Sequence, residues 1–142
     1  NLILAEVPID TLFDELRAIL MPIADKEDIA LEIKSDNEIY HMEKDLILCL
    51  IINLVDNAKK AGADRIRVFA KNHTLSVIDN GKGISTEHIG KITQPFYTVD
   101  SARHIGNCGL GLALCGRIAE IHKTELKITS KIGRGTVVQV RL

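Results

Sequence analysis

The stretch Ile51–Lys60, IINLVDNAKK, places two asparagines, Asn53 and Asn57, one turn apart in a helical pattern that is otherwise largely apolar. Asparagine is unfavourable inside helices, because its amide competes for backbone hydrogen bonds and prefers caps and turns. Lys60 follows about one turn after Asn57, so the three polar side chains share one helix face. We therefore expect this face to hold a group that satisfies the two amides.

The composition is that of one globular domain. The chain has 142 residues, of which 46% are hydrophobic, and a formal net charge of −1. This length can bury a core of useful size, and the charge balance argues against a nucleic-acid-binding surface. Cys49, Cys108 and Cys115 are odd in number and form no CxxC pair, which favours reduced thiols over a disulfide framework and argues against a zinc site.

The ends of the sequence indicate a piece of a longer protein. No apolar run approaches the roughly 20 residues of a membrane span, and no signal segment opens the chain. The sequence begins at Asn1 without a methionine and continues at once with apolar residues. We expect residues 1–142 to be a single cytoplasmic domain of a parent protein that could itself be anchored in a membrane.

Helical periodicity predicts the helices of the domain. Residues 85–92 are expected to form a short helix, and residues 93–108 show no period, which is typical of a functional or disordered loop. The three main helical patterns are Thr11–Ala24, with Pro22 marking or bending its end; Glu43–Ala61, with Gly62 as its C-terminal cap; and Gly109 to about His122.

Strand periodicity indicates a sheet with one covered face. The alternating segments are Ile29–Ile33, Glu38–His41, Ile66–Ala70, Leu75–Asp79, Leu126–Ile128 and Thr136–Leu142. The opposite sides of these strands carry polar residues: Arg65, Arg67, Lys71, Lys127, Gln139 and Arg141. The pattern predicts an α/β fold, a two-layer α/β sandwich with a mixed β-sheet and helices packed on one face, rather than a doubly wound sheet.

A first glycine cluster follows the strand that ends at Asp79. Strand alternation puts this carboxylate on the side that also buries Leu75 and Val77, where it needs a partner. Gly81 and Gly83 come next, and glycine allows close approach of the backbone to a ligand or a positive φ. An ordinary turn with an Asx cap is the alternative interpretation.

A second glycine cluster, residues 106–112, precedes the last helix. Glycines at this point expose helix N-terminal amides, which attract anions such as phosphate; a flexible start of the helix is the alternative. Neither cluster completes a GxGxxG motif, and the sequence has no GxxxxGK[ST] motif. Amide oxygens suit Mg²⁺, which bridges substrate phosphates. Together the clusters and the asparagine helix predict a cavity for a metal ion and a triphosphate.

In this order and spacing the motifs resemble the ATP-binding catalytic domain of bacterial sensor histidine kinases, within the superfamily of gyrases, heat-shock chaperones, histidine kinases and mismatch-repair ATPases. The resemblance covers nearly the whole chain and implies the Bergerat ATP-binding fold. Residues 53–60, NLVDNAKK, match the N box. The match implies that Asn57 binds Mg²⁺ and that Asn53 and Lys60 lie near the phosphates.

The other family motifs imply further contacts with ATP. Residues 79–83, DNGKG, match the first G box, in which Asp79 accepts a hydrogen bond from the adenine amino group. Residues 133–136, GRGT, match the late segment whose threonine lies near adenine. Residues 95–97, PFY, match the F box, and residues 109–112, GLGL, match the second G box. The residues implied to contact the nucleotide are Gly81, Gly83, Ile84, Phe96, Tyr97, Gly109, Leu110, Gly111, Leu112 and Thr136.

The sequence departs from the family pattern in two ways. Asn107 stands where a glycine is often found. The segment between Tyr97 and Gly106, which corresponds to the ATP lid of the family, is short. None of the five histidines, His41, His73, His88, His104 and His122, lies in the phosphoacceptor motif. The substrate histidine is therefore expected on an adjoining dimerisation domain outside this chain.

The resemblance predicts a protein histidine kinase. The domain is expected to bind Mg²⁺ and ATP and to transfer the γ-phosphoryl group to that histidine, with a response regulator downstream and no nucleic-acid partner. Asn53 stands where superfamily hydrolases commonly hold a glutamate that activates water, and an asparagine cannot take up that proton. We expect the isolated domain to be a monomer and the parent a homodimer.

Two alternatives remain open from the sequence. An anti-sigma-factor serine kinase has a similar length and acts on a separate protein, although the segment Pro95–Tyr97 favours a histidine kinase. A nucleotide-sensing or partner-binding module without phosphotransfer would fit the unusual Asn107 and the short lid.

Overall fold

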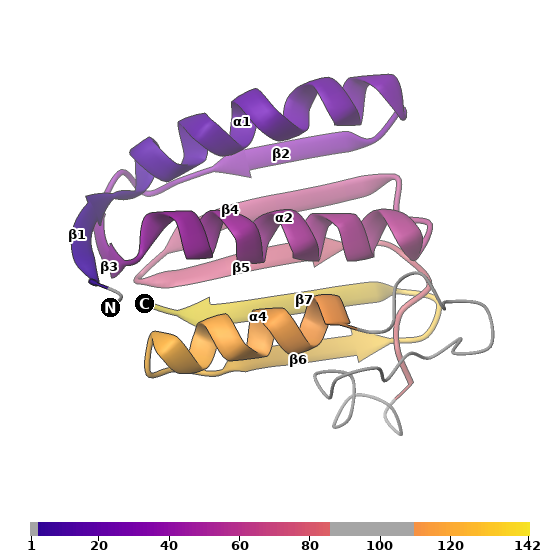
Figure 1. Cartoon of the computed structure of the whole chain (residues 1–142). Helices are drawn as coiled ribbons and strands as arrows, with labels where there is room; N and C mark the ends of the chain where they lie inside the picture. Colours follow the sequence, from indigo (N-terminus) through magenta and orange to yellow (C-terminus); the bar gives the residue numbers. More distant parts are fainter. Residues whose placement is uncertain (1–2, 86–109) are drawn as a thin grey trace.

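The computed structural model describes residues 3–85 and 110–142 (Figure 1). In chain order the elements of this part are β1 (Ala5–Pro8), α1 (Ile9–Lys26), β2 (Ala30–Lys34), β3 (Ile39–Met42), α2 (Lys44–Lys60), β4 (Arg65–Lys71), β5 (Thr74–Asp79), α4 (Leu110–Ile121), β6 (Leu126–Lys131) and β7 (Gly135–Arg141). The predicted helix at residues 85–92 and the predicted loop at residues 93–108 lie outside the described residues, apart from Ser85.

The described strands form one large mixed sheet and one small sheet. The large sheet has the order β2-β4-β5-β7-β6, and β1 pairs with β3 in the small one. The β2–β4 pair is parallel, whereas the β4–β5, β5–β7 and β6–β7 pairs are antiparallel. Helices α1, α2 and α4 lie on the same side of the large sheet (Figure 1). The predicted two-layer α/β sandwich is confirmed.

The core lies between the helices and the covered face of the sheet. Each large apolar side chain buried there contributes about 1.5–3 kcal/mol relative to leaving it exposed. Fully or almost fully buried residues of this layer include Leu12, Phe13, Leu16, Leu50, Ile51, Leu54, Ile66, Val68, Leu75, Val77 and Val140. The arginines and lysines predicted for the other face of β4, β6 and β7 are exposed. The alternation of apolar and polar residues along the strands thus predicted correctly which face of the large sheet is covered and which is exposed.

Two elements near the N-terminus differ from the sequence prediction. Helix α1 begins at Ile9 and continues past Pro22 to Lys26, so the proline lies inside the helix instead of ending it. Strand β1 was not predicted. It has four residues, AEVP, with no alternating burial pattern, and its partner β3 lies more than 30 residues further along the chain, so local sequence gave no signal for it.

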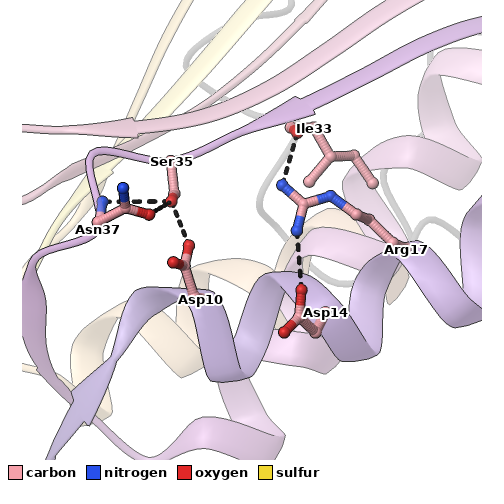
Figure 2. A network of polar contacts seen from close by, with 6 residues as sticks. All are labelled: Asp10, Asp14, Arg17, Ile33, Ser35 and Asn37. Carbon is pink, nitrogen blue, oxygen red and sulfur yellow. Dashed lines mark hydrogen bonds and ion pairs between the residues drawn. The ribbon is translucent and has the colours of Figure 1, made fainter.

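Polar contacts fix α1 against the β2–β3 connection (Figure 2). The Ser35 hydroxyl donates to the Asp10 carboxylate at the start of α1. The guanidinium of Arg17 donates to the carbonyl oxygen of Ile33 at 2.9 Å and to Asp14 at 3.0 Å. Because β2 is an edge strand of the large sheet, the bond from Arg17 satisfies a backbone acceptor of that strand and holds α1 beside it.

Helix α2 carries the asparagines and is capped at both ends. The Glu43 carboxylate accepts a hydrogen bond from the backbone N–H of Leu46 at 2.7 Å. The backbone N–H of Glu43 donates to Nε2 of His122, just after α4, at 3.0 Å. Gly62, at φ 81°, follows the last turn, as the sequence predicted. These contacts fix α2 relative to α4.

Candidate functional site

A pocket of about 90 Å³ lies between α2, the N-terminal part of α4 and the covered face of the large sheet. Its wall is mainly apolar, and its polar side chains come from four different elements or connections, which is typical of a ligand site. The lining residues are Leu54, Asn57, Ala61, Val77, Asp79, Lys82, Gly83, Ile84, Leu112, Ile128, Thr136 and Val138.

The two asparagines of α2 face the start of α4. A Cβ atom added to Gly111 would lie 3.6 Å from Oδ1 of Asn57 and 3.8 Å from Oδ1 of Asn53. The Asn53 amide is held by its own helix, since Nδ2 donates to the carbonyl oxygen of Cys49 at 2.9 Å. By contrast, Nδ2 of Asn57 is buried and has no hydrogen-bond partner among residues 3–85 and 110–142. Such an atom is uncommon in folded proteins, and a bound polar ligand or a bridging water is one way to satisfy it.

Asp79 contributes the carboxylate of the pocket from the end of β5. Its Oδ1 accepts a hydrogen bond from the backbone N–H of Gly81 at 2.8 Å. Burial raises the pKa of Asp79 above its ordinary value of 3.8, and the nearby backbone N–H groups of Gly81 and Thr136 partly oppose the rise. The pocket therefore contains a half-buried acceptor that favours a hydrogen-bond donor on a ligand.

Two glycines allow the backbone to close around the pocket. Gly83 has φ +78°, and a Cβ there would lie 2.1 Å from the carbonyl oxygen of Lys131. Gly135 has φ +111°, and a Cβ there would lie 2.0 Å from the carbonyl oxygen of Asp79. Only glycine fits such approaches at positive φ, so these residues bring the chain after β5 and the start of β7 together at the pocket.

The structure brings many of the residues implied by the family motifs into one place. Those that line the pocket are Asn57, Asp79, Gly83, Ile84, Leu112 and Thr136. Gly81 is buried, and a Cβ there would meet Ala61 at 2.8 Å. Asn53 lies next to Gly111 rather than in the pocket wall. Lys60 pairs with Asp56 on α2 at 2.9 Å, and its predicted phosphate contact stays a prediction.

Other predicted positions lie at or beyond the edge of the described part. Phe96, Tyr97 and Gly109 lie outside it, as does Asn107. Leu110 is the first residue of α4. The predicted roles of these residues in the lid and at the phosphates therefore stay predictions.

Sequence reasoning missed part of the pocket wall. The apolar members Leu54, Val77 and Val138 were assigned to the core face of their elements but not to a site. The sequence signal was the strand alternation, which puts Val77 on the same face as Asp79 and Val138 on the same face as Thr136; in the structure Val77 pairs with Val138 and Asp79 pairs with Thr136. Residues paired in this way project to the same face of a sheet, so apolar neighbours of Asp79 and Thr136 continue the same surface.

The chain belongs to the family described as histidine kinase-, DNA gyrase B- and HSP90-like ATPases, whose model matches residues 43–142. Sensor histidine kinase YkoH of Bacillus subtilis (strain 168) is 36% identical over 122 residues, which cover 82% of this chain and 27% of that protein. Sensor protein SrrB of Staphylococcus aureus (strain NCTC 8325 / PS 47) is 30% identical, over 95% of this chain and 25% of that protein. Within the family, the chain is an ATP-binding catalytic domain of the sensor histidine kinase type, as the motifs indicated.

Solved structures agree with the fold. The catalytic domain of histidine kinase ThkA matches with a TM-score of 0.78 at 23% identity, over 97% of this chain and 95% of that one. Full-length ShkA in complex with AMPPNP matches with a TM-score of 0.81 at 21% identity, over 98% of this chain and 30% of that one. The chain thus spans about a quarter of the length of the two curated relatives named above. Within residues 3–85 and 110–142, no helix has the length and apolar character needed to cross a membrane.

Replacement of Asp79 by asparagine separates its predicted role in nucleotide binding from its effect on stability. A raised pKa means that the folded protein binds the proton more tightly than the unfolded one, so stability falls as pH rises from about 3.8 through the folded pKa. The ionised carboxylate therefore lowers stability at neutral pH. We expect Asp79→Asn to be at least as stable as the wild type at pH 7, and to lose this advantage below pH 4.

The same variant is expected to bind ATP about 10- to 100-fold more weakly, because a hydrogen bond to a charged acceptor is lost. Urea unfolding at pH 7 and at pH 3.5 measures the first effect, and calorimetric titration at pH 7 measures the second. Unchanged ATP affinity, or a variant that is clearly less stable than the wild type at pH 7, would contradict the role given to Asp79.

Proposed function

We propose that this domain binds ATP with Mg²⁺ in the pocket described above and transfers the γ-phosphoryl group to a histidine on an adjoining domain of a longer protein. The observation that carries the proposal is the buried Nδ2 of Asn57, which no other group in the described part of the chain satisfies and which lies next to Gly111 at the start of α4. Asp79 lies in the wall of the same pocket.

The residues around Asn57 fit a phosphate chain and its metal ion. The start of a helix offers backbone N–H groups and a positive dipole end to anions, and Gly111 leaves the space above Asn57 and Asn53 unfilled. An amide side chain offers an oxygen to Mg²⁺ and an N–H to a phosphate oxygen. Asn57 would hold Mg²⁺, which supplies charge neutralisation when bound. Asn53, Lys60 and the segment 109–112 would lie near the phosphates.

The rest of the pocket fits adenine. The apolar wall from Leu54, Val77, Ile128 and Val138 suits a flat aromatic base. Asp79 would accept a hydrogen bond from the exocyclic amino group, and burial makes that bond stronger than in water. Gly81 would position the carboxylate through its N–H. Gly83, Ile84, Leu112 and Thr136 would complete the wall, and Phe96 and Tyr97 would belong to the lid.

Transfer to a protein residue is favoured over hydrolysis. Phosphoryl transfer needs chiefly positioning and charge stabilisation, whereas hydrolysis also needs a group that activates water. Asn53 cannot act as that base, and its amide is already held by the carbonyl of Cys49. The partners would be a dimerisation and phosphoacceptor domain of the same homodimeric parent, on the cytoplasmic side of a membrane if the parent is anchored there, and a response regulator downstream.

Labelled ATP added to the longer parent protein tests this function. The expected product is a phosphoprotein whose phosphate is lost in acid and retained in alkali, as for phosphohistidine, and whose formation requires Mg²⁺. A parent that never incorporates phosphate under these conditions, although it binds ATP, would support a binding module instead. Acid-stable phosphate on serine of a separate protein would support a serine kinase.

A further inference from the structure

A row of polar residues crosses the covered face of the sheet at the pocket. In register, Asp79 of β5 lies beside Thr136 of β7, and Thr136 lies beside Ser130 of β6. The next row on the same face is apolar, with Val77, Val138 and Ile128 side by side. Ser130 does not line the pocket itself. Its place directly behind Thr136 suggests that it acts through that residue.

The hydroxyl of Ser130 makes three short contacts. It accepts a hydrogen bond from the backbone N–H of Ile84 at 2.7 Å. It donates to the carbonyl oxygen of Gly135 at 2.8 Å, and its Oγ lies 2.8 Å from Oγ1 of Thr136. A hydroxyl carries one proton and two acceptor lone pairs. Because the proton of Ser130 points at Gly135, the proton of Thr136 must point at Ser130.

This arrangement fixes how Thr136 can interact with a ligand. With its only proton turned toward Ser130, the Thr136 hydroxyl presents lone pairs to the pocket. Asp79 presents a carboxylate, and the N–H group of Gly81, which could otherwise donate to a ligand, donates to that carboxylate. The Asp79–Thr136 row thus offers two acceptors, while Asn57 and Lys82 also line the pocket. An amino group is attracted to such a row, and a carbonyl oxygen is repelled by it.

We propose that Ser130 is a positioning residue for nucleotide selectivity, which holds the Thr136 hydroxyl as an acceptor and so favours a 6-amino purine over a 6-oxo purine. The proposal rests on the nucleotide-binding function given above. Loss of Ser130 frees the Thr136 hydroxyl to rotate and donate to a ring carbonyl. The variant pocket then binds a 6-oxo purine nucleotide less weakly, relative to a 6-amino purine nucleotide, than the wild-type pocket does.

Calorimetric titration of the whole chain with MgATP and with MgITP tests the proposal, because inosine carries a 6-oxo group and an N1–H where adenosine carries a 6-amino group and an unprotonated N1. The ratio of the two affinities is expected to favour ATP in the wild type and to fall about 10-fold in Ser130→Ala, the size of one discriminating hydrogen bond. Ser130→Thr keeps the hydroxyl and is expected to restore the ratio. Thr129→Ala, exposed on the other side of β6, is the matched control and is expected to leave it unchanged.

A purely structural role for Ser130 predicts a different result. Loss of packing at this site would lower stability, or weaken both nucleotides equally, and either result with an unchanged ratio would overturn the proposal. If Ser130→Ala does not fold, Thr136→Val serves instead: the ratio must fall in this variant, and an unchanged ratio would again overturn the proposal. A wild-type chain that binds neither nucleotide would overturn the proposed function and this inference with it.

Discussion

Alanine in place of Asn57 is expected to weaken the Mg²⁺-dependent binding of ATP at least about 100-fold. Loss of residues that only support a metal ligand commonly lowers metal affinity 10- to 100-fold, and Asn57 is proposed to be a ligand itself. Stability should change little, because Nδ2 of Asn57 has no hydrogen bond to lose within the described residues, 3–85 and 110–142. Titrations of the variant with ATP, with and without Mg²⁺, and urea unfolding measure the two effects.

Asn72→Gly provides the matched control for this experiment. Asn72 lies in the exposed turn between β4 and β5 at φ 52°, a conformation that glycine adopts freely. The control is expected to bind MgATP like the wild type. If Asn57→Ala also keeps its Mg²⁺-dependent affinity, Asn57 does not hold the metal ion. If the variant unfolds, the asparagine has a structural role that the observed contacts do not reveal.

Alanine in place of Gly135 is expected to destabilise the fold by more than about 3 kcal/mol. The backbone there has φ +111°, and the new Cβ would lie 2.0 Å from the carbonyl oxygen and 2.8 Å from the carbonyl carbon of Asp79. Both neighbours are backbone atoms that cannot rotate away. Relief of the clash requires β7 to move away from β5, and a forced backbone shift together with a disfavoured φ accounts for a loss of this size.

Gly133→Ala isolates the contribution of the dihedral angle. Gly133 has φ +82°, but a Cβ there would meet nothing within 4 Å. Its replacement should lower stability by only about 1–2 kcal/mol, the usual penalty of a left-handed conformation. Urea unfolding of both variants checks the comparison. Equal losses in the two variants would show that the close approach of β7 to Asp79 does not matter for stability.

Much of the fold could be predicted from the sequence because local periodicity reports which side of each element is buried. The alternation of Ile66, Val68 and Ala70 is an example, and the structure buries these residues. Periodicity says little about which strands are neighbours. The pairing of β5 with β7 joins segments about 60 residues apart, and the short strand β1 gains its structure only from β3.

The site could be predicted only in part, because the sequence shows local patterns but not which distant segments come into contact. Asn53 and Asn57 share a helix face by their spacing alone, and the glycines after Asp79 are a local signal. The contact between Gly111 and Asn57, and the bonds that join Ser130 to Ile84, Gly135 and Thr136, depend on tertiary structure. A serine in a strand carries no such information. Helical spacing places Lys60 near Asn57, and in the structure its ammonium group pairs with Asp56 on the same helix. The spacing alone did not predict this ion pair.

Binding of ATP to this chain, with and without Mg²⁺ and beside GTP, tests the central claim most directly. Isothermal titration calorimetry is expected to show binding of ATP that is strengthened by Mg²⁺, and much weaker binding of GTP, because Asp79 and the lone pairs of Thr136 repel a 6-oxo group. Equal affinity for the two nucleotides would contradict the roles given to Asp79, Thr136 and Ser130. Absence of binding to either would show that the pocket between α2, α4 and the sheet is not a nucleotide site.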